Sequence, residues 1–431
     1  MVDWWGHRWN ECNICRNPDA RRKGIRLTEA DKPRPPLLPG LIVGTAGLIV
    51  LGVQPLLYGA YVHQGLIDEA RLGSLAAAEI SAIAFGSVGG IALLRRWPAR
   101  IVGLLGLVLL VFGNLAPFAL TLFITRIVAG AGGGALVSIA ATQIAGRDNV
   151  NAASGAYLLL QATSQYAVLQ GFSLFAPAAS AMAVQQALAG MAAAAGLLLL
   201  LVPHTLRPHQ EECGSGLPPG GGWVALAASA LFVGGAVGTW AYFGVWLEAA
   251  GLAGDGVAAR LTASMAGQMI GAVIAIALGT RRHSSRQVMA AGLFLIAALV
   301  LLLLRGPDGV AGWALIAGFG VAWMIGTPAL SGLLLELDPT RRSLPYAASA
   351  QLLGAAVVPT LTGELLAAHG LDLVLACSAV LFAAAITTVL GGMALRQTRH
   401  HRTLTPPIHS GPSAESQVGS NGTAPAPGNR R

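Results

Sequence analysis

The stretch LIVGTAGLIVLGVQPLLYGAY, residues 41–61, contains no charged side chain. A helix of roughly 20 apolar residues crosses a hydrocarbon core about 30 Å thick. Similar uncharged runs recur along the chain, at 101–115, 187–202, 289–304 and 374–395. A water-soluble fold has no place for so much continuous apolar sequence. The pattern therefore predicts an all-α integral membrane protein.

The composition agrees with a membrane protein. Hydrophobic residues make up 54% of the chain and charged residues 11%, against about 45–50% and 25% in soluble domains. The formal net charge is +8, but the Lys and Arg residues lie in short segments between apolar runs, where such residues orient a protein in the membrane. We therefore expect the lipid bilayer as a partner and no nucleic acid binding.

The apolar runs predict twelve transmembrane helices in two bundles. The expected spans are 39–62, 72–94, 101–117, 119–143, 150–173, 182–203, 222–248, 257–280, 287–305, 310–335, 344–367 and 371–395. The expected domains are a disordered cytoplasmic leader (1–38), a six-helix bundle (39–203), a cytoplasmic linker (204–221), a second six-helix bundle (222–395) and a disordered cytoplasmic tail (396–431).

The positive charges predict the orientation. Most of the 27 Lys and Arg residues fall in the leader, the tail and alternate loops, and only Arg71, Arg260 and Arg305 fall in the other loops. Because cytoplasmic segments carry an excess of Lys and Arg, we expect both termini in the cytoplasm. A bacterial inner membrane is the expected location.

The second bundle repeats features of the first in the same order. The matching pairs are Gly65-Leu66 with Gly251-Leu252 (offset 186), Gly130 and Gly132 with Gly318 and Gly320 (188), and Arg71-Leu72 with Arg260-Leu261 (189). This register places Gln268 opposite Glu79 and Ala314 opposite Arg126, although short Gly, Ala and Leu identities also arise by chance. Two parallel repeats are typical of transporters whose solute site lies between the halves.

Two motifs connect these repeats with a known family. The segment Arg126-Ile-Val-Ala-Gly130-Ala-Gly132-Gly-Gly134 resembles the Arg-x-x-x-Gly-x-Gly motif of the major facilitator superfamily. Arg95-Arg96-Trp97-Pro98-Ala99-Arg100 resembles a degenerate form of that family's basic loop between spans 2 and 3. The resemblance covers about residues 39–396, and it implies twelve helices that transport a solute by alternating access, driven by an ion gradient.

Arg126 and Glu79 are the first candidates for a functional pair. A guanidinium within a lipid span costs at least about 2.5–3.5 kcal/mol, so we expect it to face a cavity or a partner. Both residues lie roughly 10–12 Å from the outer ends of their spans at 1.5 Å per residue, and we expect them to meet. Glu79 would exchange a proton while Arg126 controls its pKa or holds an anionic solute group. The alternative is a permanent structural ion pair.

Polar and aromatic side chains within the spans are candidates for the substrate path. Tyr157, Gln161 and Gln165 share one face of their helix, and Gln268 and Gln351 lie in spans of the second bundle. The alternative is that these amides only bond neighbouring helices. Tyr58 and Trp240 are deep enough to stack on a solute. Tyr61 and Trp246 are expected to anchor at the membrane interface, and Pro55, Pro328 and Pro359 to kink their helices.

The expected function is secondary active transport of a small organic solute, with protons or another ion as the coupling partner. A drug or metabolite efflux antiporter is an alternative, although the span 150–173 lacks the Pro-containing pattern of drug-proton antiporters. A transporter-like solute receptor is a second alternative. The sequence shows no catalytic constellation, and we expect neither an enzyme nor a cofactor. The pair Cys12 and Cys15 has no second pair to complete a metal site.

Overall fold

In the computed structural model, the described residues are 36–404 except 68, 117–120, 176–179, 205, 207–216, 253 and 280–282. The helices of the first half are α1 (Leu38–Ala46), α2 (Ile49–His63), α3 (Glu69–Leu94), α4 (Ala99–Leu115), α5 (Leu122–Ala145), α6 (Val150–Phe175) and α7 (Ala181–Gly196), followed by the short helix η4 (Leu197–Leu201). The expectations for the leader up to residue 35 and for the tail after residue 404 lie outside the described residues, as does Cys12-x-x-Cys15.

The second half repeats this order. Its helices are α8 (Gly220–Ala249), α9 (Gly254–Leu278), α10 (Ser284–Arg305), α11 (Gly309–Leu337), η5 (Leu344–Tyr346), α12 (Ala347–His369) and α13 (Asp372–Leu404). Each predicted span has its helix. The first is broken into α1 and α2, and α7 continues as η4. The last apolar span ends at Gln397, close to the predicted end, but the expected disorder of the tail from residue 396 is wrong up to Leu404, because α13 continues to that residue.

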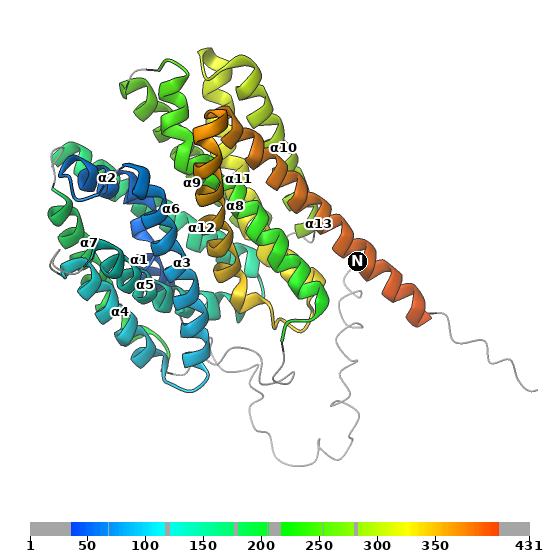
Figure 1. The fold of residues 1–431 in the computed structure, drawn as a ribbon. Helices are drawn as coiled ribbons and strands as arrows, with labels where there is room; N and C mark the ends of the chain where they lie inside the picture. Colours follow the sequence, from blue (N-terminus) through cyan, green and yellow to red (C-terminus); the bar gives the residue numbers. More distant parts are fainter. Residues whose placement is uncertain are drawn as a thin grey trace, which may run out of the picture.

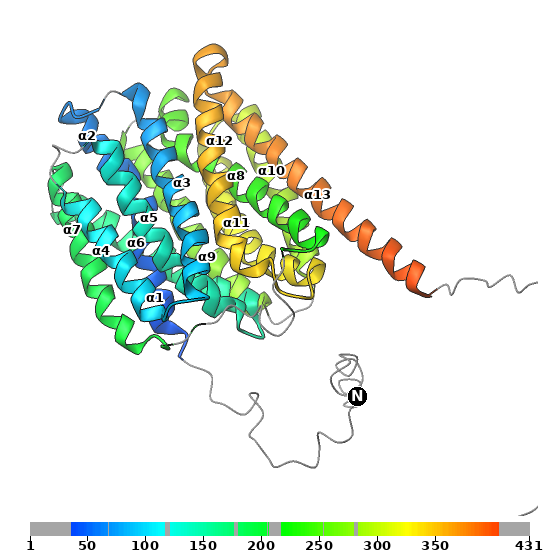
Figure 2. The same cartoon turned by 60° about the horizontal axis from the view of Figure 1, so that its bottom comes forward.

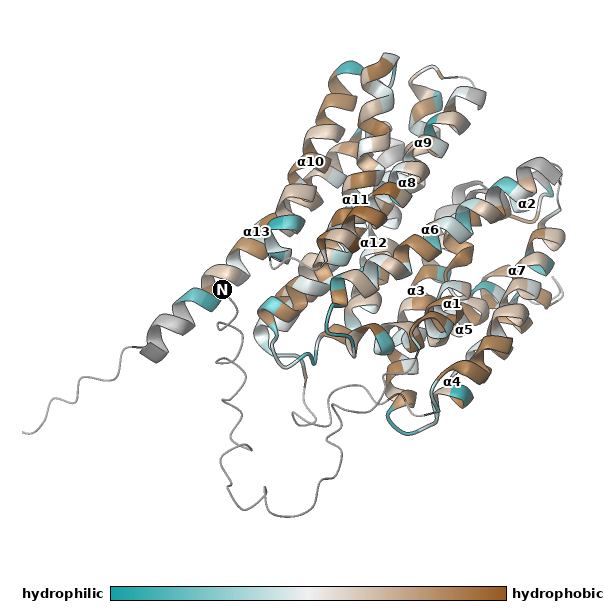
Figure 3. Cartoon of the chain, turned by 180° about the vertical axis from the view of Figure 1, so that it is seen from behind, coloured by the Kyte–Doolittle hydropathy of each residue, from teal (hydrophilic) through white to brown (hydrophobic). Residues whose placement is uncertain are grey.

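The described helices have the length and character of membrane spans. Eight are both long and apolar enough to cross a membrane, and 38–54, 99–115 and 344–357 are shorter apolar helices. Large apolar side chains are exposed on the outer faces, including Leu104 and Val108 of α4 and Val380 of α13. Figure 3 shows long hydrophobic stretches, in brown, along helices such as α4, α10 and α13. The chain is therefore an integral, multi-pass membrane protein.

The helices form two bundles that lie side by side (Figure 1). In the first bundle α5 packs against α3 and α4, and in the second α11 packs in the same way against α9 and α10. Between the bundles, α3 contacts α12 and α6 contacts α9, and Figure 2 shows α3 beside α12. The two halves are therefore joined by corresponding pairs of helices.

Glycines at the helix ends show the repeat directly. Gly65 and Gly251 both have a positive φ, of 66° and 93°, a conformation that glycine adopts without steric cost. The next residue in each case, Leu66 or Leu252, donates its N–H back to a carbonyl five residues earlier, at 2.9 and 3.2 Å. The first helices of the two halves thus end in the same way, and the offset of 186 is confirmed there.

The predicted offset is wrong by about two turns between α3 and α9 and by two residues between α5 and α11. A Cβ added at Gly86 would overlap the Ala131 carbonyl oxygen, and one at Gly267 would overlap that of Ala317. Likewise Gly134 closely approaches the Ile83 carbonyl oxygen, and Gly320 that of Ser264. The offset is therefore 181 between α3 and α9 and 186 between α5 and α11.

This corrected register changes the expected equivalences. Glu79 corresponds to Arg260 rather than to Gln268, and Arg126 corresponds to Gly312 rather than to Ala314. The sequence comparison failed here because Arg71-Leu72 and Arg260-Leu261 are identical by coincidence. Close backbone contacts, rather than matching letters, keep the register of packed helices.

Contacts between the halves close one end of the molecule. This closed end carries the loops with Arg95, Arg147 and Arg341 (the lower end in Figure 1). The bonds that join the halves there are Arg95 to Tyr346 (2.7 Å), Asn151 to Ser284 (2.8 Å), Ser154 to Ser331 (3.1 Å) and Arg341 to the carbonyl oxygens of Ala145 (3.3 Å) and Arg147 (3.4 Å). Toward the other end the two bundles diverge.

Candidate functional site

A cavity of about 550 Å³ lies between the two halves. Its inner end is lined by Ile144, Ser331 and Leu344, near the closed end, and it extends to Glu248 in the last turn of α8, whose side chain is exposed. The cavity therefore opens away from the closed end. Its volume falls within the range of roughly 300–1,000 Å³ that is usual for small-molecule sites.

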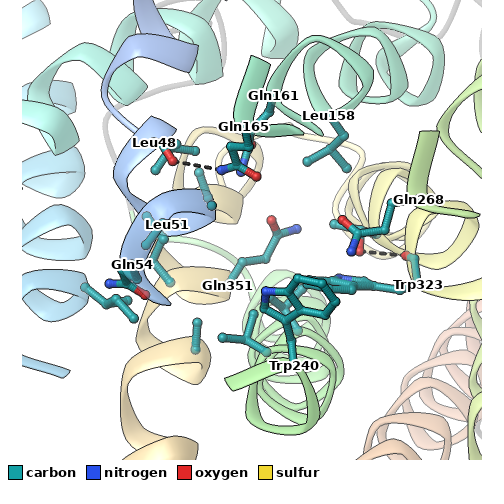
Figure 4. Close-up of a pocket in the computed structure, with 18 of the residues that line it drawn as sticks. Leu48, Leu51, Gln54, Leu158, Gln161, Gln165, Trp240, Gln268, Trp323 and Gln351 are labelled. Carbon is teal, nitrogen blue, oxygen red and sulfur yellow. Dashed lines mark hydrogen bonds between the residues drawn. The ribbon is translucent and has the colours of Figure 1, made fainter. Parts of the chain in front are cut away.

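The structure brings all seven residues predicted for the substrate path to the wall of this cavity. They are Tyr58, Tyr157, Gln161, Gln165, Trp240, Gln268 and Gln351. Figure 4 shows Gln165 from the first half, and Gln268, Gln351 and Trp240 from the second, around the same open space. Their placement makes a role in solute binding possible, and that role stays a prediction.

A helix break shapes the wall of the first half. Between α1 and α2 the chain turns at Gly47 and Leu48, and a Cβ at Gly47 would overlap the backbone of Gly133 in α5. The Leu48 carbonyl oxygen accepts a hydrogen bond from Gln165 Nε2 at 2.9 Å. One glutamine of the polar stripe on α6 therefore does bond a neighbouring helix, as the alternative interpretation proposed, while it also faces the cavity.

Aromatic rings form the wall of the second half. The rings of Trp240 on α8 and Trp323 on α11 lie 6.4 Å apart at an interplanar angle of 53°. Phe319 packs against Trp323, and the centroids of these two rings are 6.1 Å apart. Pro328 lies within α11 and has no N–H, so the carbonyl of Met324, a cavity-lining residue, has no helical partner from Pro328.

Glu79 and Arg126 meet inside the first bundle. Arg126 Nη1 lies 3.2 Å from Glu79 Oε1, and the two side chains are 0% and 1% exposed. Arg126 Nη2 donates to Asn114 Oδ1 at 2.9 Å and to the Gly113 carbonyl oxygen at 3.2 Å, both on α4. Gly130 allows this approach, because a Cβ there would lie 2.5 Å from the Glu79 carbonyl oxygen.

The pair is set back from the cavity, and Tyr58 connects the two. Neither Glu79 nor Arg126 lines the cavity, whereas Tyr58 and Gln54 do. The Tyr58 hydroxyl donates to Glu79 Oε2 and accepts from Gln54 Nε2 at 3.3 Å. A chain of hydrogen bonds thus runs from the cavity through Tyr58 to the buried carboxyl group.

The expected anchoring of Tyr61 and Trp246 at the membrane interface is wrong. Tyr61 is fully buried and its hydroxyl accepts a hydrogen bond from Gln185 Nε2 at 2.9 Å. Trp246 is 4% exposed and its indole Nε1 donates to Asp372 Oδ1 at 2.9 Å. Both polar groups bond neighbouring helices instead of the interface.

The residues of the two family-like motifs pack helices together or make contacts at the closed end. Gly132 lies against α4, where a Cβ would meet the Gly106 carbonyl oxygen at 2.5 Å. Arg95 bonds Tyr346 across the halves, and Arg100 donates to the carbonyl oxygens of Leu200 (2.7 Å) and Val202 (3.2 Å) at the end of η4. Arg96 is exposed.

Several cavity residues were not singled out from the sequence. The clearest are Gln54, Met265, Trp323, Thr327 and Ser331. Gln54 had a usable signal, because it is an amide within an uncharged apolar run. For the others, short hydroxyl side chains and scattered large ones give no pattern that distinguishes a cavity wall from a helix contact. Within the described residues, no group of three His, Cys, Asp or Glu side chains could hold a metal ion.

No protein-family model and no curated protein matches this sequence. Solved structures do match. The Escherichia coli fucose:proton symporter aligns with a TM-score of 0.65 at 14% identity, over 83% of this chain and 97% of that one. The proton:xylose symporter XylE, a major facilitator superfamily protein, gives 0.64 at 13%, over 82% and 94%.

A third similar structure is the human organic anion transporter MFSD10, with a TM-score of 0.62 at 16% identity, over 82% of this chain and 97% of that one. The chain has the major facilitator superfamily fold. The predicted fold class, twelve membrane helices in two parallel six-helix repeats, is thereby confirmed. In this chain, the cavity described above lies between the two repeats of that fold. At 13–16% identity the likeness concerns the fold and does not transfer a substrate.

Proposed function

We propose that this protein is a secondary active transporter, which carries a small organic solute across the membrane by alternating access and couples its movement to protons. The observation that carries the proposal is a central cavity that is closed at one end by bonds between the halves and open at the other. Two of the structurally similar proteins are proton symporters by name, which supports the coupling ion.

The charge distribution supports an orientation for this state. The closed end carries the arginine-rich loops, and cytoplasmic loops are enriched in Lys and Arg. We therefore assign the closed end and both termini to the cytoplasm, so that the cavity faces outward. In the opposite state, the bonds that join the halves at the closed end would break.

Glu79 is the proposed proton site, with Arg126 as its compensating charge. A carboxyl group shielded from lipid and water, bonded to a cationic partner and linked to the cavity through Tyr58, can exchange a proton when the cavity changes its occupancy or its open side. A permanent structural pair has the same static geometry, so transport measurements must decide between the two roles.

The test is transport into proteoliposomes under an imposed pH gradient, with a library of candidate solutes. We expect a solute that accumulates only while the gradient lasts. Glu79→Gln should abolish uphill accumulation yet retain exchange of labelled for unlabelled solute. The matched control is Asp308→Asn, which also neutralises a carboxylate, at a position that is 76% exposed and outside the cavity.

Each contrary outcome has a distinct meaning. Solute movement that is independent of every imposed ion gradient would contradict proton coupling. Accumulation that survives in Glu79→Gln would leave the pair a structural role only. A solute that binds without crossing the membrane would favour the receptor alternative.

A further inference from the structure

The described residues place no charged group in the interior of the cavity. Among the described residues that line it, Glu248 is the only one with a charged side chain, and Glu248 is exposed at the open end. The buried charges of Glu79 and Arg126 face each other behind Tyr58. A charged solute group in the inner part of the cavity would lose its hydration without meeting an opposite charge, which is unfavourable.

The polar groups of the wall are amides together with a few hydroxyl groups, such as those of Tyr157, Thr327 and Ser331. Five glutamines line the cavity, namely Gln54, Gln161, Gln165, Gln268 and Gln351. A primary amide presents a donor and an acceptor side by side, and Gln161 Oε1 is buried without a hydrogen-bond partner among the described residues. In Figure 4 the amides of Gln268 and Gln351 extend into the space between the halves.

The rest of the wall is mostly apolar and partly flat. Trp240 and Trp323 present indole rings, and Leu51, Leu158 and Met324 line the cavity beside them. Planar rings stack favourably on indoles. A polyol, which carries hydroxyl groups around its whole periphery, would leave some of them unpaired against this apolar wall, and unpaired buried polar groups weaken binding.

These three observations define one chemistry. We propose that the transported solute is an uncharged planar heterocycle with an adjacent donor and acceptor on its edge, as in cyclic amides and nucleobases. Such an edge pairs with an amide through two hydrogen bonds, as Gln does with adenine. Gln268 and Gln351 bind the edge, and Trp240 stacks on the ring. The inference rests on the proposed transport function and specifies its substrate class.

The test is binding to the purified full-length protein in detergent, followed by its thermal unfolding. The panel contains heterocycles such as uracil, adenine and their nucleosides, each with a carboxylated and an aminated derivative, together with hexoses. We expect stabilisation by neutral heterocycles only. Gln351→Leu and Trp240→Leu should each weaken that binding about 5- to 100-fold.

Two matched controls keep the test specific to the cavity. The control for Gln351→Leu is Gln287→Leu, because Gln287 is on α10 and does not line the cavity. The control for Trp240→Leu is Trp223→Leu, because Trp223 is 53% exposed on the outer surface of α8. Both should bind like the parent protein. The inference is overturned if carboxylates, amines or hexoses bind best, if no neutral heterocycle stabilises the protein, or if the two cavity variants bind normally.

Flux measurements separate this inference from the transport proposal. A neutral heterocycle that binds but is not carried across proteoliposomes would overturn transport and leave the binding class standing. A carboxylate or hexose that accumulates would support transport and overturn the proposed substrate class. Because a neutral solute adds no charge, its uptake together with a proton carries net positive charge inward, and an inside-negative potential without a pH gradient should drive such symport.

Discussion

Arg126 holds together three helices of the first bundle, because its guanidinium bonds Glu79 on α3 and both Gly113 and Asn114 on α4. We predict that Arg126→Gln lowers the free energy of unfolding by about 3–5 kcal/mol, since it leaves Glu79 buried without its cation. The double variant Glu79→Gln/Arg126→Gln should recover much of this loss. Thermal unfolding in detergent measures both, and a double variant less stable than either single would contradict the prediction.

Tyr58 occupies the contact between cavity and carboxyl group. Tyr58→Phe removes only the hydroxyl that donates to Glu79 and accepts from Gln54, so the ion pair remains. We predict that accumulation driven by a pH gradient falls, while solute exchange continues at a similar rate. The matched control is Tyr166→Phe, on α6 outside the cavity. An equal effect of both substitutions would show that Tyr58 has no special part in coupling.

At the same scale, the sequence was sufficient to predict the surroundings of some residues and insufficient for others. The meeting of Glu79 and Arg126 was predictable, because two opposite charges at a similar depth in apolar spans have few other partners. Trp240 was expected deep in its span and does line the cavity, whereas the contact of Trp246 with a neighbouring helix was not predictable. Both lie on α8, and the choice between cavity, neighbouring helix and membrane interface depends on how the bundles assemble.

At the scale of elements, close contact between helix backbones fixes α3 against α5. Gly134 is the tightest position, because a Cβ there would meet Ser87 N at 2.6 Å and the Gly86 carbonyl carbon at 2.8 Å. We predict that Gly134→Ala lowers the free energy of unfolding by about 1–3 kcal/mol through overpacking. Thermal unfolding in detergent provides the measurement.

Gly89, exposed on the same α3 helix, is the matched control for this substitution. A Cβ there meets nothing within 4 Å, so Gly89→Ala should be neutral or should stabilise by up to about 1 kcal/mol through helix propensity. If both variants unfolded like the parent protein, the two helices would be less tightly packed than the structure shows.

The helices also show which structural features the sequence pattern could not predict. Apolar runs located every helix, because the bilayer fixes the length of a span. The break at Gly47 and Leu48 was missed, because the run around it is uniformly apolar and the break depends on contact with Gly133. The correspondence between α3 and α9 was missed because an identity of two residues, such as Arg71-Leu72 with Arg260-Leu261, can arise by coincidence.

At the scale of the whole molecule, two similar bundles contact each other at one end and enclose a cavity that opens at the other. The topology follows from apolar length, and the proposed orientation follows from the positions of Arg and Lys. The state of the molecule does not, because under the proposed mechanism the same sequence adopts both an outward-facing and an inward-facing arrangement. The contacts that join the two halves at the closed end, such as Ser154 to Ser331 and Arg95 to Tyr346, identify the state described here.

That contact provides the test of alternating access. The Ser154 and Ser331 hydroxyl oxygens lie 3.1 Å apart at the inner end of the cavity, close enough for a disulfide after small shifts. In a background with the four native cysteines replaced, we predict that oxidised Ser154→Cys/Ser331→Cys binds solute but exchanges none, because the closed end cannot open. Reduction should restore exchange, and neither single variant should respond to oxidant. Undiminished exchange through the cross-linked protein would mean that the solute crosses without separation of the halves at this end.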